Sequence, residues 1–366
     1  MKILYLSTAR VPDTWAHVVQ IMKMCEAFAN AGNEVELIVP RRGATEIGDP
    51  FVSAGVRPVF KIVKLPCIDI APGTQSGLLY WVRTLSFLFA AALHLLGKKY
   101  DLLYTRELFS VGNLKKTAFE LHSLHGVSTH AVKICNRARA VIAITVGLKY
   151  ALIEQGVNGE KILVAPDGVA LEDFQKPESR DVSRRRLGLP TDAKTAMYIG
   201  ILDSWKGVGT LYEAAPLLQP DIAVAVIGGF SNEEETLRKL HPLVAFLGFR
   251  PYTELPDNQQ AADILVLPNS GKEILSAKYT SPLKLFTYMA SGVPIVASDL
   301  PSLREVLSEK NAYFATPDDA ESFAEKIREA LAFPDEAKKR AAQARADVER
   351  YTWSMRAKAI LEFICV

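Results

Sequence analysis

One segment in the last third of the chain combines the features of an anion-binding helix start. Ser281 suits the N-cap position, and Pro282 suits the first helical position, where no backbone N–H is needed. Gly292 suits the left-handed residue that ends a helix. Lys284 lies in the first turn, where a cation opposes the helix dipole unless an anion is bound. The segment predicts a phosphate site; the alternative is an ordinary capped helix with Lys284 in solvent.

A second loop places another lysine in a comparable position. The apolar run 197–199 ends at Gly200, and Lys206-Gly207 precedes a predicted helix. A cation between a strand end and a helix start can reach a bound phosphate. Because Lys-Gly pairs are common in loops, Lys206 supports a phosphate site only together with Lys284.

Two further loops follow predicted strands and carry ionisable side chains. His122 comes directly after the apolar run 118–121, and His125 is the competing candidate three residues on. The loop 7–17 follows the first predicted strand and carries Arg10 and His17. Ligands of parallel α/β sheets bind at the carboxyl ends of the strands, so these loops are expected to face a ligand. A lone histidine is more often structural, and that alternative stays open for His122.

The elements that position these residues alternate from end to end. Strand-like apolar runs alternate with amphipathic segments of helix length, which indicates parallel α/β sheets. The charged, proline-containing stretch 167–192 interrupts the pattern and is interpreted as a connector. We expect two doubly wound domains, residues 1–170 and 171–351. The predicted strands are 3–6, 35–39, 102–104, 118–121, 141–144 and 162–164, then 196–199, 222–227, 244–247, 264–267 and 294–297.

Composition limits the class of protein. The chain has 366 residues, which suits two domains of ordinary size. Its net charge of +2 lacks the basic excess of nucleic-acid-binding domains, so no nucleic acid is expected as a partner. Its four cysteines form no Cys-x-x-Cys pair, which excludes the usual zinc spacings and gives no sign of a disulfide framework. We therefore expect a cytoplasmic protein with no metal site.

The apolar segment 78–96 raises the question of a membrane. Arg83 and His94 interrupt it, so its clean apolar run is shorter than the roughly 20 residues of a spanning helix. A buried core helix is the favoured interpretation. The alternative is a peripheral contact with the inner face of a membrane, because aromatic and basic residues flank one another there.

Several motifs in order resemble one family, the retaining GT-B glycosyltransferases of family 4, also described as glycosyl transferases group 1. The resemblance covers most of the chain and is dense over 196–307. Its motifs are Val164-Ala165-Pro166-Asp167-Gly168-Val169, Gly200…Lys206-Gly207, Gly248-Phe249-Arg250…Glu254-Leu255 and the stretch from Ser281 to Asp299. The resemblance implies the GT-B fold, with two Rossmann-like domains facing across a cleft and a C-terminal helix, 352–366, packing back on the first domain.

The resemblance also implies roles for individual residues. Lys206 matches the cation that neutralises the donor diphosphate, and Arg250 matches the loop beside the nucleobase. His122 matches the histidine that faces the transferred sugar, which makes His122 and Lys206 the catalytic candidates. The donor-binding candidates are Gly200, Lys206, Arg250, Ser281, Leu283, Lys284 and Thr287, and Arg10 and His17 belong to the acceptor-side loop.

Three departures from the family pattern stand out. The family commonly places two glutamates eight positions apart around this helix, and this chain has Tyr279 and Thr287 there. Ile201 replaces a frequent arginine, and the usual Gly-Gly turn near the amino terminus is absent from residues 7–18. The first two changes bear on donor binding.

The resemblance therefore implies a retaining, metal-independent transferase. It would move a hexose-type sugar from a nucleoside-diphosphate sugar, as substrate and without a cofactor, to a saccharide or lipid-linked acceptor. The alternative is a weakened or inactive protein of the same kind that binds nucleotide sugars.

Overall fold

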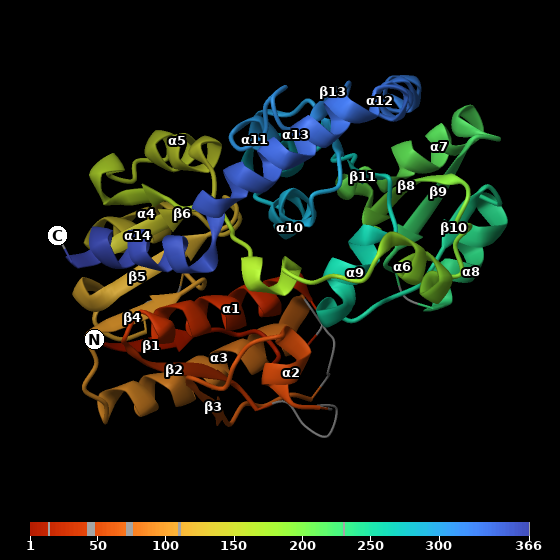
Figure 1. Ribbon diagram of the computed structural model, residues 1–366. Helices are drawn as coiled ribbons and strands as arrows, with labels where there is room; N and C mark the ends of the chain where they lie inside the picture. The colour runs from red at the N-terminus through yellow and green to blue at the C-terminus, as the bar shows by residue number, and fades with distance from the viewer. Residues whose placement is uncertain (14, 42–47, 71–75, 109–110, 230, 366) are drawn as a thin grey trace. The chain divides into compact units, whose positions relative to one another are not determined.

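A computed structural model of the chain describes residues 1–13, 15–41, 48–70, 76–108, 111–229 and 231–365 (Figure 1). For residues 231–234 it describes the backbone alone. The chain forms two compact units, the first being Met1–Pro166 with Trp353–Val366 and the second Asp167–Thr352. The predicted divisions, after residue 170 and before residue 352, lie within a few residues of these boundaries.

The first unit is built on a parallel sheet. In the described residues its order is β3-β2-β1-β4-β5-β6-β7, and each adjacent pair is parallel. The order reverses between β1 and β4, and in doubly wound sheets the ligand crevice lies at such a reversal. The strands are β1 (Lys2–Leu6), β2 (Glu34–Pro40), β3 (Lys61–Leu65), β4 (Leu102–Thr105), β5 (Thr117–Leu121), β6 (Ala140–Ala143) and β7 (Ile162–Val164).

Helices connect these strands and cover the sheet. The side chains of α1 are buried almost all round from Val18 to Phe28, because the helix packs between β2 and α14. Figure 1 shows α14, in dark blue, among the elements of this unit although it ends the chain. The helices are α1 (Ala16–Asn30), α2 (Pro50–Ala54), α3 (Gly77–Leu96), α4 (Thr129–Arg137), α5 (Val146–Glu154) and α14 (Trp353–Cys365).

The second unit repeats the architecture. Its parallel sheet has the order β10-β9-β8-β11-β12-β13 in the described residues. The strands are β8 (Lys194–Ile199), β9 (Ile222–Ile227), β10 (Val244–Phe246), β11 (Ile264–Leu267), β12 (Ile295–Ser298) and β13 (Tyr313–Ala315). The helices are α6 (Arg180–Leu187), α7 (Val208–Leu218), α8 (Ser231–Leu240), α9 (Leu255–Gln260), α10 (Leu283–Ser291), α11 (Pro301–Arg304), α12 (Ala320–Ala332) and α13 (Pro334–Asp347).

Two strands were not predicted, and both lie at sheet edges. Every residue of β3 is at least partly exposed, and lysines interrupt its apolar pattern at Lys61 and Lys64. The other, β13, has three residues. An edge strand is covered less fully than a central one, so it needs no continuous apolar run that would reveal it in the sequence.

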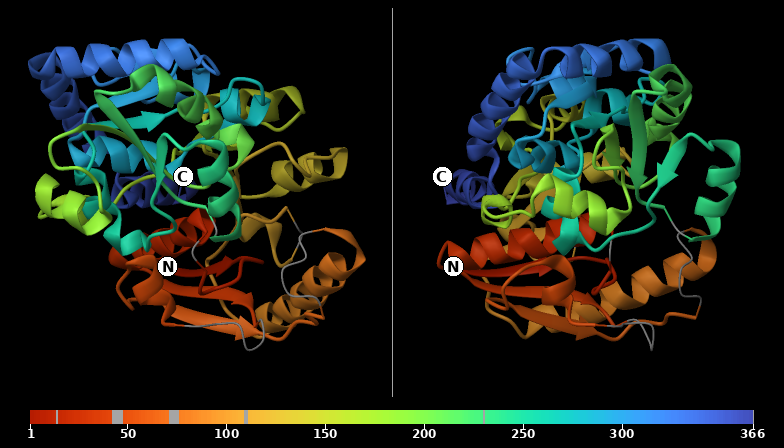
Figure 2. Two further views of the ribbon diagram at one scale, coloured as in Figure 1. Left: turned by 90° about the vertical axis from the view of Figure 1, so that its right-hand side faces the viewer. Right: turned by 45° about the vertical axis from the view of Figure 1, so that its right-hand side comes forward.

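The interpretation of residues 78–96 as a buried core helix is wrong for one face of α3. Phe87, Leu88 and Ala91 are buried against the sheet, in one cluster with Leu4 and Leu103. Figure 2 shows α3 in orange at the border of the first unit. Its opposite side is open, because a helix that covers one face of a sheet contacts that face with one side only. That side exposes Leu78, Trp81, Leu85, Phe89, Leu93 and Leu96, each at 47% or more of the residue's surface.

The exposed side chains recur three or four residues apart, so they form one stripe along α3. We call this stripe the α3 apolar face. By length and composition alone, α3 is also the one helix in the described residues that could cross a membrane, with 33% of its apolar window buried. Its inner side packs on the unit's own sheet, so α3 is part of the fold.

Candidate active site

A close approach of two chain segments forms the phosphate-binding candidate of the second unit. Gly200 follows β8, and Lys284 lies in the first turn of α10. A Cβ atom at Gly200 would stand 2.8 Å from Lys284 Nζ and 3.1 Å from Tyr198 Oη. A side chain at position 200 would displace the ammonium group, and the backbone φ of 153° also favours glycine there. The predicted strand-end loop and helix start do meet in the structure.

Tyr198 holds the ammonium group of Lys284. Lys284 Nζ donates a hydrogen bond of 2.5 Å to Tyr198 Oη and lies 3.8 Å from the centre of that ring. The tyrosine donates in turn to the carbonyl of Ile201 at 2.6 Å. Burial and the positive charge of Lys206 hold the pKa of Lys284 well below its usual range. Lys284 therefore sits where its own charge is disfavoured.

Lys206 is the second cation of this site. It ends a short 3-10 helix (Ser204–Lys206), and its Nζ lies 3.4 Å from the centre of the Trp205 ring. Burial lowers the pKa of Lys206 to about 8, against the opposing charges of Asp203 and Asp167. Within the part of the chain that the structure describes, neither Lys206 nor Lys284 forms an ion pair with a carboxylate. The two cations, which we call the lysine pair, are thus arranged for an anion.

The start of α10 differs from the predicted cap. The helix begins at Leu283, and Pro282 occupies the N-cap position with no side-chain cap among the described residues. The prediction that Ser281 caps the helix is wrong, because its hydroxyl accepts a hydrogen bond from the backbone N–H of Asp167 at 3.0 Å. The first N–H groups of α10 therefore lack a capping side chain, and such groups can bind an anion.

Thr287 lies one turn further along α10 and faces inward. It is 2% exposed, donates to the carbonyl of Lys284 at 3.1 Å and accepts from Gln259 Nε2 at 3.0 Å. Its hydroxyl is thus engaged in an internal network. Tyr279 is partly exposed at the end of a π-helical turn (Leu275–Tyr279).

Two more side chains of the second unit have buried polar atoms available to a ligand. Arg250 follows β10, and its Nε has no hydrogen-bond partner in the described residues. Asn269 follows β11, is fully buried, and neither of its amide atoms has a partner in that same part of the chain. Buried polar groups are normally hydrogen-bonded, so both are candidates for ligand contacts. Asn269 was not predicted, because an asparagine after a strand is also typical of a turn.

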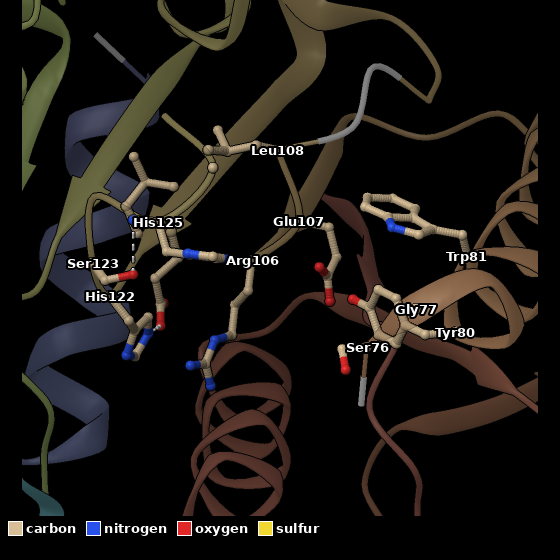
Figure 3. Close-up of a pocket in the computed structure, with 13 residues that line it drawn as sticks. Ser76, Gly77, Tyr80, Trp81, Arg106, Glu107, Leu108, His122, Ser123 and His125 are labelled. Atoms are coloured by element: carbon tan, nitrogen blue, oxygen red, sulfur yellow. Dashed lines mark hydrogen bonds and ion pairs between the residues drawn. The ribbon is translucent and has the colours of Figure 1, made fainter. Parts of the chain in front are cut away.

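The first unit has a pocket at the carboxyl end of β5. It has a volume of about 580 Å³. Figure 3 shows His122 and Arg106 projecting from one side and Trp81 from the other. We call it the His122 pocket. It is lined by Ser76, Gly77, Tyr80, Trp81, Arg106, Glu107, Leu108, Glu120, Leu121, His122, Ser123, His125 and Gly126.

Both histidines considered from the sequence line this pocket, whereas the acceptor-loop candidates do not. His122 hydrogen-bonds Glu120 through Nε2 at 2.6 Å, and the backbone N–H of His125 donates to Ser123. Arg10 is partly exposed in the loop after β1, and His17 is exposed in the first turn of α1. Neither of these two belongs to the pocket lining. Glu120 and Arg106 are pocket residues that were not predicted from the sequence.

A metal ion has no evident site among the described residues, where no group of three or more His, Cys, Asp or Glu side chains could hold one. The chemistry available to the described residues is therefore that of two buried lysines, a helix start and a histidine beside a carboxylate. This set suits the binding of a phosphorylated ligand and of hydroxyl groups.

Comparison with known proteins finds a family match within the second unit. Residues 193–332 match the family described as glycosyl transferases group 1. A D-inositol 3-phosphate glycosyltransferase of Xylanimonas cellulosilytica is 29% identical over 57% of this chain and 52% of its own length. A phosphatidyl-myo-inositol mannosyltransferase of Mycolicibacterium smegmatis is 24% identical over 92% of this chain and 86% of its own. The chain spans about half the length of the first relatives it matches.

Solved structures give the fold of the whole chain. The structure of Anabaena HepE in complex with UDP and glucose superposes with a TM-score of 0.77 at 18% identity, covering 100% of this chain and 99% of that one. The sucrose-phosphate synthase of Thermosynechococcus elongatus superposes with a TM-score of 0.75 at 21% identity, covering 99% and 97%. The predicted fold class is confirmed. Residues 193–332 thus match the glycosyl transferases group 1 family, and the chain has the GT-B fold.

Proposed function

We propose that this protein is a glycosyltransferase that moves a hexose-type sugar from a nucleoside-diphosphate sugar to an acceptor hydroxyl. The observation that carries the proposal is the lysine pair beside the uncapped start of α10. Two cations with lowered pKa values and no carboxylate partner in the described residues are costly unless an anion binds there. A diphosphate supplies that anion, and the match to group 1 glycosyltransferases supports a sugar as the group it carries.

The lysine pair also suits the chemical step. When the sugar leaves the diphosphate, negative charge grows on the phosphate oxygen that the sugar departs from. Lys206, Lys284 and the N–H groups at the start of α10 would stabilise that charge, and such preorganised electrostatics usually dominate catalysis of this type. Cationic side chains can replace a metal ion in this role, so we propose a metal-independent reaction. We also propose retention of anomeric configuration, as in family 4, which the sequence motifs resemble.

The donor site would continue along the second unit from the lysine pair. Arg250, whose Nε lacks a partner among the described residues, would contact the base, and Gly200 would leave room for the phosphates. Thr287 would contribute little to ribose binding, because its hydroxyl is already bonded to Gln259 and to the Lys284 carbonyl. Of the donor-binding residues expected from the sequence, this proposal keeps those that would contact the phosphates and the base, and it leaves out Thr287 as a ribose contact.

The acceptor side would be the His122 pocket. Its aromatic and polar lining suits a saccharide, whose rings stack on aromatic faces while their hydroxyls hydrogen-bond. Trp81 belongs both to the pocket lining and to the α3 apolar face. We therefore propose a lipid-linked saccharide as the acceptor, with the α3 apolar face resting on the inner surface of a membrane and the protein otherwise cytoplasmic.

A donor screen tests the proposed reaction. Hydrolysis and transfer are measured with UDP-, GDP- and ADP-sugars, while a thermal-shift titration with the free nucleoside diphosphates measures binding. Turnover with one donor family is expected, and it should persist in the presence of a chelator. Nucleotide binding without turnover in the presence of lipid-linked and free saccharides would instead favour the inactive, binding-only alternative.

Vesicle binding tests the membrane contact. Co-sedimentation with phosphatidylglycerol-containing vesicles is expected for the wild-type chain. Leu85→Glu with Phe89→Glu should abolish it, because each places a charge in the apolar contact. Lys338→Glu on the exposed surface of α13 is a matched control for added negative charge. Equal sedimentation of the control and the α3 variant would contradict the contact.

A further inference from the structure

A fully buried carboxylate lies beneath His122. Glu120 is on β5, a strand that is otherwise apolar or uncharged, and its side chain is 0% exposed. A buried charge is stable only when it is paired and hydrogen-bonded. The first unit supplies Glu120 with a charge partner and with hydrogen bonds. One oxygen, Oε1, accepts from Gln20 Nε2 and from His122 Nε2, each at 2.6 Å. The other, Oε2, accepts from Tyr104 Oη and from Arg356 Nη1, the latter at 3.0 Å.

The positive charge that pairs with Glu120 belongs to Arg356, which lies 236 positions further along the sequence. It lies on α14, is 5% exposed, and also donates from Nε to the carbonyl of Pro166 at 2.8 Å and from Nη2 to that of Ala165 at 3.2 Å. Its guanidinium therefore ties α14 to the chain just after β7 and to Glu120 on β5. The ion pair balances one negative charge with one positive charge, so Glu120 needs no second cation beside it.

The protonation state of His122 follows from this balance. Burial alone would raise the pKa of Glu120, but Arg356 and the hydrogen bond from His122 hold it well below its usual range. Burial and the nearby Arg106 lower the pKa of His122 to about 4, against the opposing effect of Glu120. The histidine is thus neutral near pH 7. An ionised carboxylate only accepts hydrogen bonds, so the ring hydrogen must be on Nε2.

The other ring nitrogen is left for a ligand. Nδ1 of His122 has no hydrogen-bond partner in the described part of the first unit, and the residue lines the pocket. In the neutral Nε2–H tautomer, Nδ1 carries a lone pair and can only accept. Figure 3 shows the ring of His122 at the pocket with the dashed contact on its other nitrogen.

We propose that Glu120 and Arg356 are positioning residues that fix His122 as the neutral Nε2–H tautomer, and that Nδ1 accepts a hydrogen bond from a substrate hydroxyl in the His122 pocket. The contact with Glu120 places a ring hydrogen on Nε2, and burial beside two cations keeps the ring neutral, whereas the identity of the hydroxyl as a sugar's rests on the proposed function. Through Arg356, helix α14 therefore helps to fix the tautomer of a histidine that lines the pocket.

The charged groups that face His122 come from three elements of the first unit. Arg106 from the loop after β4, Glu120 from β5 and Arg356 from α14 are the charged side chains that act on its pKa. Two of these three are cations, which disfavour imidazolium. A neutral ring held by a carboxylate is the same arrangement by which an enzyme carboxylate orients a histidine and selects its tautomer.

The tautomer can be measured on the full chain without substrate. Nitrogen NMR of protein labelled with ¹⁵N-histidine separates Nε2–H, Nδ1–H and doubly protonated rings, and a His122→Asn variant identifies the His122 signals. We expect an Nε2–H ring at pH 7 that does not titrate until the pH falls below about 5. An Nδ1–H ring, or a doubly protonated ring at pH 7, would overturn the proposal.

Variants test the positioning role. Glu120→Gln alone leaves Arg356 as an unpaired buried charge and could unfold the unit, so Glu120→Gln with Arg356→Met removes both charges together. An amide can donate as well as accept, so the His122 tautomers should mix in this double variant. Retention of a pure Nε2–H ring by the folded double variant would refute control by Glu120 and Arg356.

Measurement of kcat distinguishes a positioning role of Glu120 and Arg356 from a purely structural one. The double variant should lose about tenfold or more in kcat with little change in donor KM, the size of one lost hydrogen bond. His130→Asn, in the exposed first turn of α4 and outside the pocket lining, is the matched control and should keep both the His122 tautomer and the kcat. A correct tautomer in a chain with no transferase activity would refute the proposed function and leave this inference standing. Mixed tautomers at unchanged kcat would refute the catalytic use of Nδ1.

Discussion

Binding of a nucleoside diphosphate should draw a proton onto Lys284. In the free protein, burial and the charge of Lys206 hold the pKa of Lys284 well below its ordinary value, which favours the neutral form of the amine. A phosphate beside Nζ favours the charged form and raises the pKa. By linkage, the complex then holds more protons than the free protein, so binding takes a proton up and does not release one.

The size of the effect follows from the contact that is made. A hydrogen bond to a charged group is worth about 1.5–3 kcal/mol, so Lys284→Met should weaken UDP binding by about 10- to 150-fold. Lys284→Arg is the matched control, because a guanidinium stays charged at every accessible pH and cannot take up a proton. The affinity of Lys284→Arg for UDP should lie between those of the wild type and Lys284→Met. The space beside Gly200 fits an ammonium group, with Nζ 2.8 Å from where a Cβ would stand, and a guanidinium is larger.

Titration calorimetry in two buffers of different ionisation enthalpy measures the proton directly. Near pH 7 the wild-type protein should take up a fraction of a proton, at most about one for this group. Lys284→Arg should show a much smaller difference in binding enthalpy between the two buffers, because only Lys206, with a pKa of about 8, can still take up a proton. Lys206→Met should bind more weakly and take up less, because the repulsion that lowers the pKa of Lys284 is gone. Tight UDP binding by the wild-type protein with identical enthalpies in both buffers would refute the reasoning.

Three further predictions concern the two units. Thr287→Glu should tighten UDP binding if the sequence alignment with the family is right, and 2′-deoxy-UDP is the control that should gain less. Arg356→Ala should lower the free energy of unfolding by about 3–5 kcal/mol by leaving Glu120 as an unpaired buried charge, measured by urea denaturation; a loss under about 1 kcal/mol would contradict the buried pair. The lowered pKa of Glu120 adds stability that is present above its unfolded value, near about 4.3, and is lost as the pH falls toward its folded value. Acidification from about pH 7 to about pH 3 should therefore lower the free energy of unfolding more in the wild type than in Glu120→Gln with Arg356→Met, and equal losses would contradict the lowered pKa.

Much of the fold could be predicted because it depends on local pattern. The alternation of apolar runs with amphipathic segments indicated two doubly wound sheets, and every predicted strand overlaps an observed one. Gly292 ends α10 with φ 73°, as a left-handed residue at that position should. These features are set by residues adjacent in the chain, so periodicity and turn chemistry reveal them.

The open face of α3 could not be predicted from its composition. Apolar residues all round a helix normally indicate burial on all sides. Which sides are covered depends on what the fold packs around the helix, and α3 packs on one face of the sheet, against β1, β2 and β4, with one side only. Likewise, Ser281 has the right residue type for a cap, but its hydroxyl meets the N–H of Asp167, which is 114 positions away in the sequence.

The sequence by itself determined the chemistry of the lysines and the helix start. A phosphate-binding segment is local, so Lys206, Lys284 and the glycines around them were visible from spacing. Tertiary structure alone decided what tunes those groups and His122. Glu120 meets Arg356 across 236 positions, and Lys284 meets Tyr198 across 86. Neither distance in sequence leaves a periodic signal, because packing of the sheet against α14 and of β8 against α10 brings each pair together. Burial then shifts their proton affinities, and burial is a property of the folded chain.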